Sequence, residues 1–124
     1  MARAAFNIDD RPIGNDMHVI EAGGELDLAA APELKQRMLD AIEDGKNRLV
    51  IDLSQATFVD STTIGVLALG LRHLKPNGGM LAVVCTNEDI LETFELIGLE
   101  RILPLHTSRD QALVELSGVP AARV

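Results

Sequence analysis

The stretch Leu49–Lys75 reads LVIDLSQATFVDSTTIGVLALGLRHLK, and it predicts a buried strand followed by an amphipathic helix. Three apolar residues come first and Asp52 follows them, a pattern typical of a strand that is buried on both faces. Further along, apolar residues recur at the spacing of one helix face, at Ile64, Leu67, Ala68 and Leu71. This helix is therefore expected to pack one stripe against a core.

Four polar residues, Asp60 to Thr63, stand directly before this helical repeat. Asp and Ser are preferred at helix N-termini because their side-chain oxygens accept hydrogen bonds from unpaired backbone N–H groups. Such capping contributes about 1 kcal/mol and needs no functional role. Three successive hydroxyl residues, Ser61, Thr62 and Thr63, nevertheless exceed what one cap requires. We therefore expect Ser61 to be displayed where the helix begins.

The same helix has a second apolar side, formed by Val66, Leu69 and Leu74. We expect Val66 and Leu69 to be exposed, since they follow Thr62 by four and seven residues. A polar helix start followed by exposed aliphatic side chains suits docking against another protein. The alternative is a helix that neighbouring elements cover on both sides.

The composition favours one folded domain that binds a protein rather than a nucleic acid. The chain has 124 residues, of which 47% are apolar, and this is enough for a single core. Three Phe, no Tyr and no Trp leave no aromatic platform for stacking bases. A net charge of −8 opposes binding to phosphate backbones or anionic lipids. We assign residues 1–118 to the domain and expect residues 119–124 to form a frayed tail.

Cysteine content and hydropathy place the chain in the cytoplasm by default. Cys85 is the only cysteine, which excludes an intramolecular disulfide and a thiol pair for a metal. It ends the apolar run Leu81–Cys85, where a thiol is expected to behave as a small hydrophobic group. No signal-peptide pattern opens the chain, and no apolar run reaches the roughly 18 residues of a membrane span.

The remaining patterns predict an α/β domain in the order β-β-α-β-α-β-α-β-α. A hairpin of two strands, 5–13 and 17–22, comes first, joined by a turn at Gly14–Asp16. Later breakers and capping patterns delimit the other elements: a helix from Pro32 to Gly45, a strand at 80–84, a helix capped at Thr86 and ending at Gly98, a strand at 103–105, and a helix capped at Ser108. We expect a mixed sheet with a parallel centre, an antiparallel N-terminal hairpin and four helices. Asp27 precedes the first helix and either turns the chain or lies near Ser61.

Motifs for catalysis or cofactor binding are missing from the sequence. It contains no GxGxxG and no GxxxxGK[ST] pattern, and so predicts no nucleotide cofactor. His18, His73 and His106 fall on three different predicted elements, without the spacing of a zinc site. One of them as a base for Ser61 would make a small serine hydrolase, but that requires proximity in space. We predict no catalytic residue, no metal site and no enzyme activity.

A phosphorylation switch, in contrast, needs only an exposed hydroxyl at an interface. A phosphate on Ser61 would add about −1.5 to −2 charges at a helix N-terminus, where the helix dipole tolerates it. A partner packed against that charge would lose contact. A loss of about 2.8 kcal/mol weakens binding roughly a hundredfold.

Two segments resemble the landmarks of the bacterial anti-sigma factor antagonists, the STAS-domain family. Residues 58–67, FVDSTTIGVL, resemble its signature, an apolar pair followed by Asp-Ser-Ser/Thr-Gly and Leu-Gly-Val-Leu. The earlier Gly24–Asp27, with Leu34 on the following helix, resembles its second landmark. The predicted element order agrees with this family over nearly the whole chain. Thr63 departs from the pattern, since it stands where glycine is usual.

The resemblance implies a binding module that switches partners. Its unphosphorylated form would bind an anti-sigma factor that is also a serine kinase, and would thereby release a sigma factor. Phosphorylation of Ser61, with Thr62 and Thr63 as alternatives, would end binding, and a PPM-type serine phosphatase would restore it. The residues expected at the partner interface are Asp27, Asp60, Ser61, Thr62, Thr63, Val66 and Leu69.

Other members of the family suggest further possibilities. A scaffold that does not switch and an accessory subunit of a lipid-transport system share the domain. The identity of the sigma factor, the kinase and the stimulus, and any self-association, are left open by the sequence.

Overall fold

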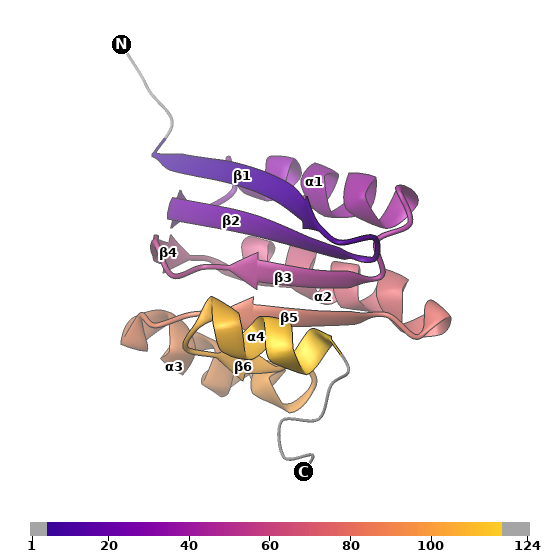
Figure 1. The fold of residues 1–124 in the computed structure, drawn as a ribbon. Helices are drawn as coiled ribbons and strands as arrows, with labels where there is room; N and C mark the ends of the chain where they lie inside the picture. The colour runs from indigo at the N-terminus through magenta and orange to yellow at the C-terminus, as the bar shows by residue number, and fades with distance from the viewer. Residues whose placement is uncertain (1–4, 118–124) are drawn as a thin grey trace.

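The computed structural model describes residues 5–117, which fold into a six-stranded sheet with helices on both faces (Figure 1). The elements run in the order β1 (Phe6–Ile13), β2 (Met17–Leu26), α1 (Ala31–Glu43), β3 (Arg48–Asp52), β4 (Ala56–Val59), α2 (Ser61–Leu74), β5 (Met80–Val84), α3 (Glu88–Ile97), β6 (Leu105–His106) and α4 (Arg109–Leu116). Short 3₁₀ turns, Lys75–Asn77 and Leu99–Arg101, follow α2 and α3. The predicted α/β class and the four helices are confirmed.

The sheet has the strand order β1-β2-β3-β5-β6. Strands β1 and β2 form the predicted antiparallel hairpin, while β3, β5 and β6 continue the sheet in parallel. Strand β4 pairs with the last residues of β2, beyond the point where β3 ends. Helices α1, α2 and α3 lie on one face of the sheet and α4 lies on the other (Figure 1).

The central strands are buried on both faces, as their apolar runs predict. In β3, Leu49 and Ile51 face the main core beneath α1, α2 and α3, whereas Val50 faces a smaller core beneath α4. The same alternation holds in β5. Cys85 follows β5 and is fully buried, and this burial raises the pKa of its thiol.

Strand β4 was missed by the sequence patterns, and β2 is longer than predicted. The expected strand ended at Ala22, but β2 continues to Leu26 through a register shift at Gly24/Glu25. Gly24 takes a left-handed conformation, with φ of +83°, and an added Cβ would stand 2.2 Å from the carbonyl oxygen of Ala5. Two glycines therefore allow the strand to bend and still pair with β4.

Helix and strand ends agree with the predictions in most places. Gly98 ends α3 in a left-handed conformation, and Ser108 caps α4 by accepting a hydrogen bond from the N–H of Gln111 at 3.2 Å. The cap predicted at Thr86 is wrong, because the Asn87 side chain accepts the N–H groups of the first helical turn instead. The last strand is 105–106 rather than 103–105. The predicted tail, 119–124, lies outside the described residues.

Candidate functional site

Ser61 is the first residue of α2, and its side chain is exposed. Asp60 precedes it in an extended conformation and caps the helix, because its Oδ1 accepts the N–H of Thr63 at 2.9 Å. No acidic residue lies in the first turn after the cap. The Ser61 hydroxyl thus stands in solvent at the positive end of a helix dipole, as predicted.

Asp27 lies at the same edge of the sheet as this helix start. Leu26 pairs with Val59 in parallel register, so Asp27 and Asp60 each follow one member of a strand pair. The N–H of Asp60 also donates to the carbonyl of Leu26 at 3.1 Å. Both roles that the sequence left open for Asp27 are therefore realised: its position is beside the helix start, and its Oδ1 accepts the N–H of Ala29 at 3.0 Å in the turn toward α1.

Two residues predicted for modification or partner contact are not accessible. Thr63 is fully buried, and its hydroxyl donates to the carbonyl of Leu26 at 2.9 Å. Val66, expected to be exposed, retains only 9% of its accessible surface and belongs to the main core. The reason is that α1 packs against α2 and covers its second apolar side. Leu69 is half-buried and Thr62 is exposed.

Two large exposed apolar side chains, in the segments that precede Asp60 and follow Asp27, were missed by the sequence reasoning. Leu28 follows Asp27 and is 69% exposed, and Phe58 lies in β4 and is 50% exposed. A signal existed for Phe58, since Val59 beside it points to the opposite face of a strand and is buried. We use the name tip surface for these two residues and their four polar neighbours at the same sheet edge: Asp27, Leu28, Phe58, Asp60, Ser61 and Thr62.

None of the three histidines lies near Ser61. His18 is the second residue of β2, whereas Ser61 lies beyond the other end of that strand, about 25 Å away over the eight residue steps from His18 to Leu26. His73 is in the last turn of α2, about 18 Å along the helix from Ser61. His106 contacts Glu115 on the other face of the sheet. The catalytic triad of a serine hydrolase is not assembled.

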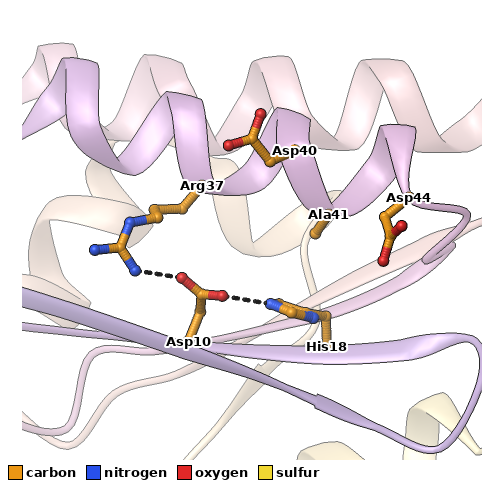
Figure 2. A pocket seen from close by; sticks show the side chains of 6 residues that line it. All are labelled: Asp10, His18, Arg37, Asp40, Ala41 and Asp44. Atoms are coloured by element: carbon orange, nitrogen blue, oxygen red, sulfur yellow. Dashed lines mark hydrogen bonds and ion pairs between the residues drawn. The ribbon is translucent and has the colours of Figure 1, made fainter.

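His18 belongs instead to a polar pocket between the hairpin and α1 (Figure 2). Its Nε2 lies 2.8 Å from Asp10 Oδ1, and the other oxygen of Asp10 accepts a hydrogen bond from Arg37. Burial by itself would raise the pKa of Asp10, but the bonds with His18 and Arg37 outweigh it and lower the pKa. These three side chains fasten β1 and β2 to α1.

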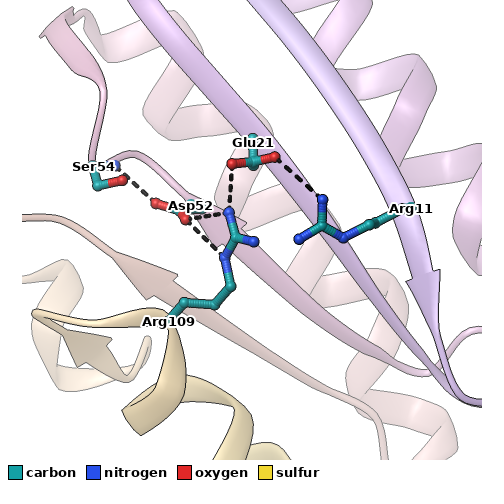
Figure 3. Close-up of polar contacts among 5 residues, drawn as sticks. All are labelled: Arg11, Glu21, Asp52, Ser54 and Arg109. Atoms are coloured by element: carbon teal, nitrogen blue, oxygen red, sulfur yellow. Dashed lines mark hydrogen bonds and ion pairs between the residues drawn. The ribbon is translucent and has the colours of Figure 1, made fainter.

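A second polar cluster joins α4 to the other face of the sheet (Figure 3). Arg109 donates from Nε and Nη2 to Oδ2 of Asp52, at 3.0 and 2.8 Å, and from Nη2 to Glu21 at 2.5 Å. Asp52 is only 6% exposed, and burial alone would raise its pKa. Hydrogen bonds from Ser54 and Arg109 outweigh this effect, so the pKa of Asp52 lies below its usual value. The cluster holds the first turn of α4 in place.

Candidate metal clusters and membrane-spanning helices are both absent from residues 5–117. In that part of the chain, no three His, Cys, Asp or Glu side chains come together in a way that could hold a metal ion. Within the same range, every helix is too short or too polar to cross a bilayer.

The sequence and the fold match those of known proteins. The family model of the STAS domain matches residues 10–112. An anti-sigma-B factor antagonist of Bacillus subtilis (strain 168) is 30% identical over 100 residues, which are 81% of this chain and 90% of that protein.

Solved structures agree with this match. The crystal structure of an anti-sigma factor antagonist from Mycobacterium paratuberculosis superposes with a TM-score of 0.82 at 28% identity, covering 90% of this chain and 94% of that one. The anti-sigma factor antagonist SpoIIAA, in its unphosphorylated form, has the same fold, with a TM-score of 0.81 at 18% identity over 92% of this chain and 99% of its own. The chain therefore belongs to the STAS domain family, among the anti-sigma factor antagonists.

Proposed function

We propose that this protein is a phosphorylation-controlled antagonist that docks on an anti-sigma factor through the tip surface. The observation that carries the proposal is the exposed Ser61 hydroxyl at the first position of α2, flanked at one sheet edge by Asp27 and Asp60. Leu28, next to Asp27, and Phe58, two residues before Asp60, are exposed apolar side chains in the same segments. Apolar anchors beside polar groups are typical of a protein-binding surface.

In the proposed switch, one modification changes binding without altering the fold. The carboxylate of Asp60 already caps the N–H of Thr63, so the helix start is satisfied before any phosphate arrives. A phosphate on Ser61 would project into solvent, with the helix dipole favouring its charge. In a complex, however, this charge would be pressed against the partner and stripped of water. The phosphate is therefore expected to destabilise the complex and to leave the free folded protein unaffected.

The exposure of the three candidate hydroxyls supports a choice among them. Ser61 and Thr62 are exposed, whereas Thr63 is buried and its hydroxyl is engaged. We assign the modification to Ser61, which alone follows the aspartate, with Thr62 as the secondary candidate. The proposed kinase is the anti-sigma factor itself, and the proposed reset enzyme is a PPM-type serine phosphatase.

Variants at Ser61 test this function directly. The chain is mixed with anti-sigma kinases from the same genome, with and without ATP and magnesium, and binding is measured by calorimetry. The wild type should bind without ATP and be released with it, with phosphate mapped to Ser61 by mass spectrometry. Ser61→Ala should bind and resist release, whereas Ser61→Glu should bind at least tenfold more weakly.

Matched controls separate the switch from general damage. Thr86→Ala removes an exposed hydroxyl from the loop before α3 and should behave as the wild type in every assay. The Thr62→Ala variant should still be phosphorylated and the Ser61→Ala variant should not, and this difference identifies Ser61 as the acceptor. Release of Ser61→Ala by ATP would contradict the assignment, and equal affinity of Ser61→Glu would exclude Ser61 from the interface.

A regulatory role is favoured over catalysis because no histidine lies near Ser61 to act as its base. All three histidines of the chain lie elsewhere, and each has another polar contact. Hydrolysis of model esters that is lost in Ser61→Ala would overturn this choice.

A further inference from the structure

The buried hydroxyl of Thr63 connects two parts of the tip surface that are far apart in the sequence. It donates to the carbonyl oxygen of Leu26 at 2.9 Å, across 37 positions of the chain. The same oxygen accepts the N–H of Asp60 at 3.1 Å. A single carbonyl at the end of β2 therefore receives two hydrogen bonds from the start of α2.

The turn beyond Leu26 depends on the position of this carbonyl. Asp27 follows directly, and its own carbonyl accepts the N–H groups of Ala30 and Ala31 at 3.0 and 3.1 Å. Its side chain accepts the N–H of Ala29. Leu28 is 69% exposed, so packing does not fix its position. The hydrogen bonds of the turn must fix it instead.

We infer that Thr63 is a positioning residue, which fixes the Asp27–Leu28 turn and the Asp60–Thr62 segment as one preorganised docking surface. The inference rests on the proposed function. Groups that are already held in their bound arrangement lose less conformational freedom on binding, and this raises affinity without a new contact. Thr63 itself is fully buried, so its side chain is not accessible to a partner. Its effect on binding must therefore pass through the two segments that it joins.

The isosteric change Thr63→Val isolates this one hydrogen bond. Valine keeps the volume of threonine, the Thr63 N–H still donates to Asp60, and Leu26 retains its bond from the Asp60 N–H. No buried backbone group is left unpaired, so the variant is expected to fold. Thr63→Ser restores the hydroxyl and serves as the rescue.

Thr93→Val is the matched control. The Thr93 hydroxyl also donates to a backbone carbonyl, that of Asp89, at 3.0 Å, but within α3 and without joining two segments. Amide hydrogen exchange is measured in the free proteins, and affinity for the anti-sigma factor is measured by calorimetry. In Thr63→Val, the amides of residues 29–31 should exchange about fivefold faster and affinity should fall about fivefold to tenfold. Thr63→Ser and Thr93→Val should match the wild type in both measurements.

The outcomes separate the two proposals. If the wild type binds no anti-sigma factor, the proposed function fails. If the wild type binds and Thr63→Val binds equally well, or if Thr63→Ser loses as much affinity as Thr63→Val, the positioning role of Thr63 is overturned. Faster exchange with unchanged affinity also overturns it, because ordering of the turn would then not contribute to docking.

Discussion

Replacing Arg109 by methionine should destabilise the fold by leaving the buried carboxylate of Asp52 without its cation. Removing one partner of a fully buried ion pair costs about 3–5 kcal/mol. The Arg109 side chain keeps 24% of its exposure, so water screens the pair in part, and the expected loss is about 2 kcal/mol. For a domain of this size, such a loss lowers the melting temperature by roughly 5–10 °C.

The helix dipole alone predicts the opposite sign for the change in stability on removing Arg109, so the experiment separates the two effects. Arg109 is the first residue of α4, where a positive charge opposes the helix dipole. Without its ion pairs, its removal would be neutral or stabilising. The control is Arg11→Met, which removes a guanidinium 3.9 Å from Glu21, in a pair whose side chains are 57% and 43% exposed. That change should alter stability by less than about 0.5 kcal/mol.

The pH dependence of the loss provides the refuting observation. In the wild type, the lowered pKa of Asp52 means that its contribution is present above the unfolded value of 3.8 and is lost as the pH falls below it. In Arg109→Met, burial remains while the cation is gone, so the pKa of Asp52 should rise. The difference in unfolding free energy between the two proteins, from urea titrations, should be largest near pH 7 and shrink toward pH 3. A difference that stays constant over this range would refute the reasoning.

Two further perturbations test the backbone and the tip surface. Gly24→Ala combines a left-handed φ with a backbone oxygen 2.2 Å from the new Cβ and should cost more than about 3 kcal/mol, whereas Gly45→Ala, at φ of +90° with open space, should cost about 1 kcal/mol by urea denaturation. Leu28→Ser and Phe58→Ser should each weaken anti-sigma factor binding about tenfold in calorimetry without lowering the melting temperature, while Leu96→Ser, at an 82% exposed position in α3, should change neither.

Neighbouring residues along the chain were sufficient to predict β3 and α2, although not the short strand β4 between them. The run Leu49–Ile51 predicts a strand, and the spacing of Ile64, Leu67 and Leu71 predicts a helix, because both patterns follow from backbone periodicity. The cap at Asp60 and the exposure of Ser61 follow from the same local chemistry.

Whether α2 was covered on its second side could not be predicted in this way. Val66 and Leu74 are apolar, and their spacing puts them outside the predicted core-facing stripe of the helix. The spacing does not show which element packs against them. Helix α1 packs against α2 and shares the main core with both residues, and it reaches this position through the sheet order, which is a property of the whole chain. The expectation that Val66 is exposed failed for this reason.

The composition of the tip surface also depends on contacts between distant segments. Local patterns identified Ser61 and allowed two roles for Asp27, but only the pairing of β2 with β4 brings Asp27 beside Asp60. The same pairing brings the Leu26 carbonyl within reach of Thr63. The Thr63 hydroxyl, which the sequence offered as a third phosphorylation candidate, is therefore buried and joins the start of α2 to the end of β2. Periodicity along a chain specifies which elements form, whereas hydrogen bonds between strands specify which elements meet, and the surface for a partner is made where they meet.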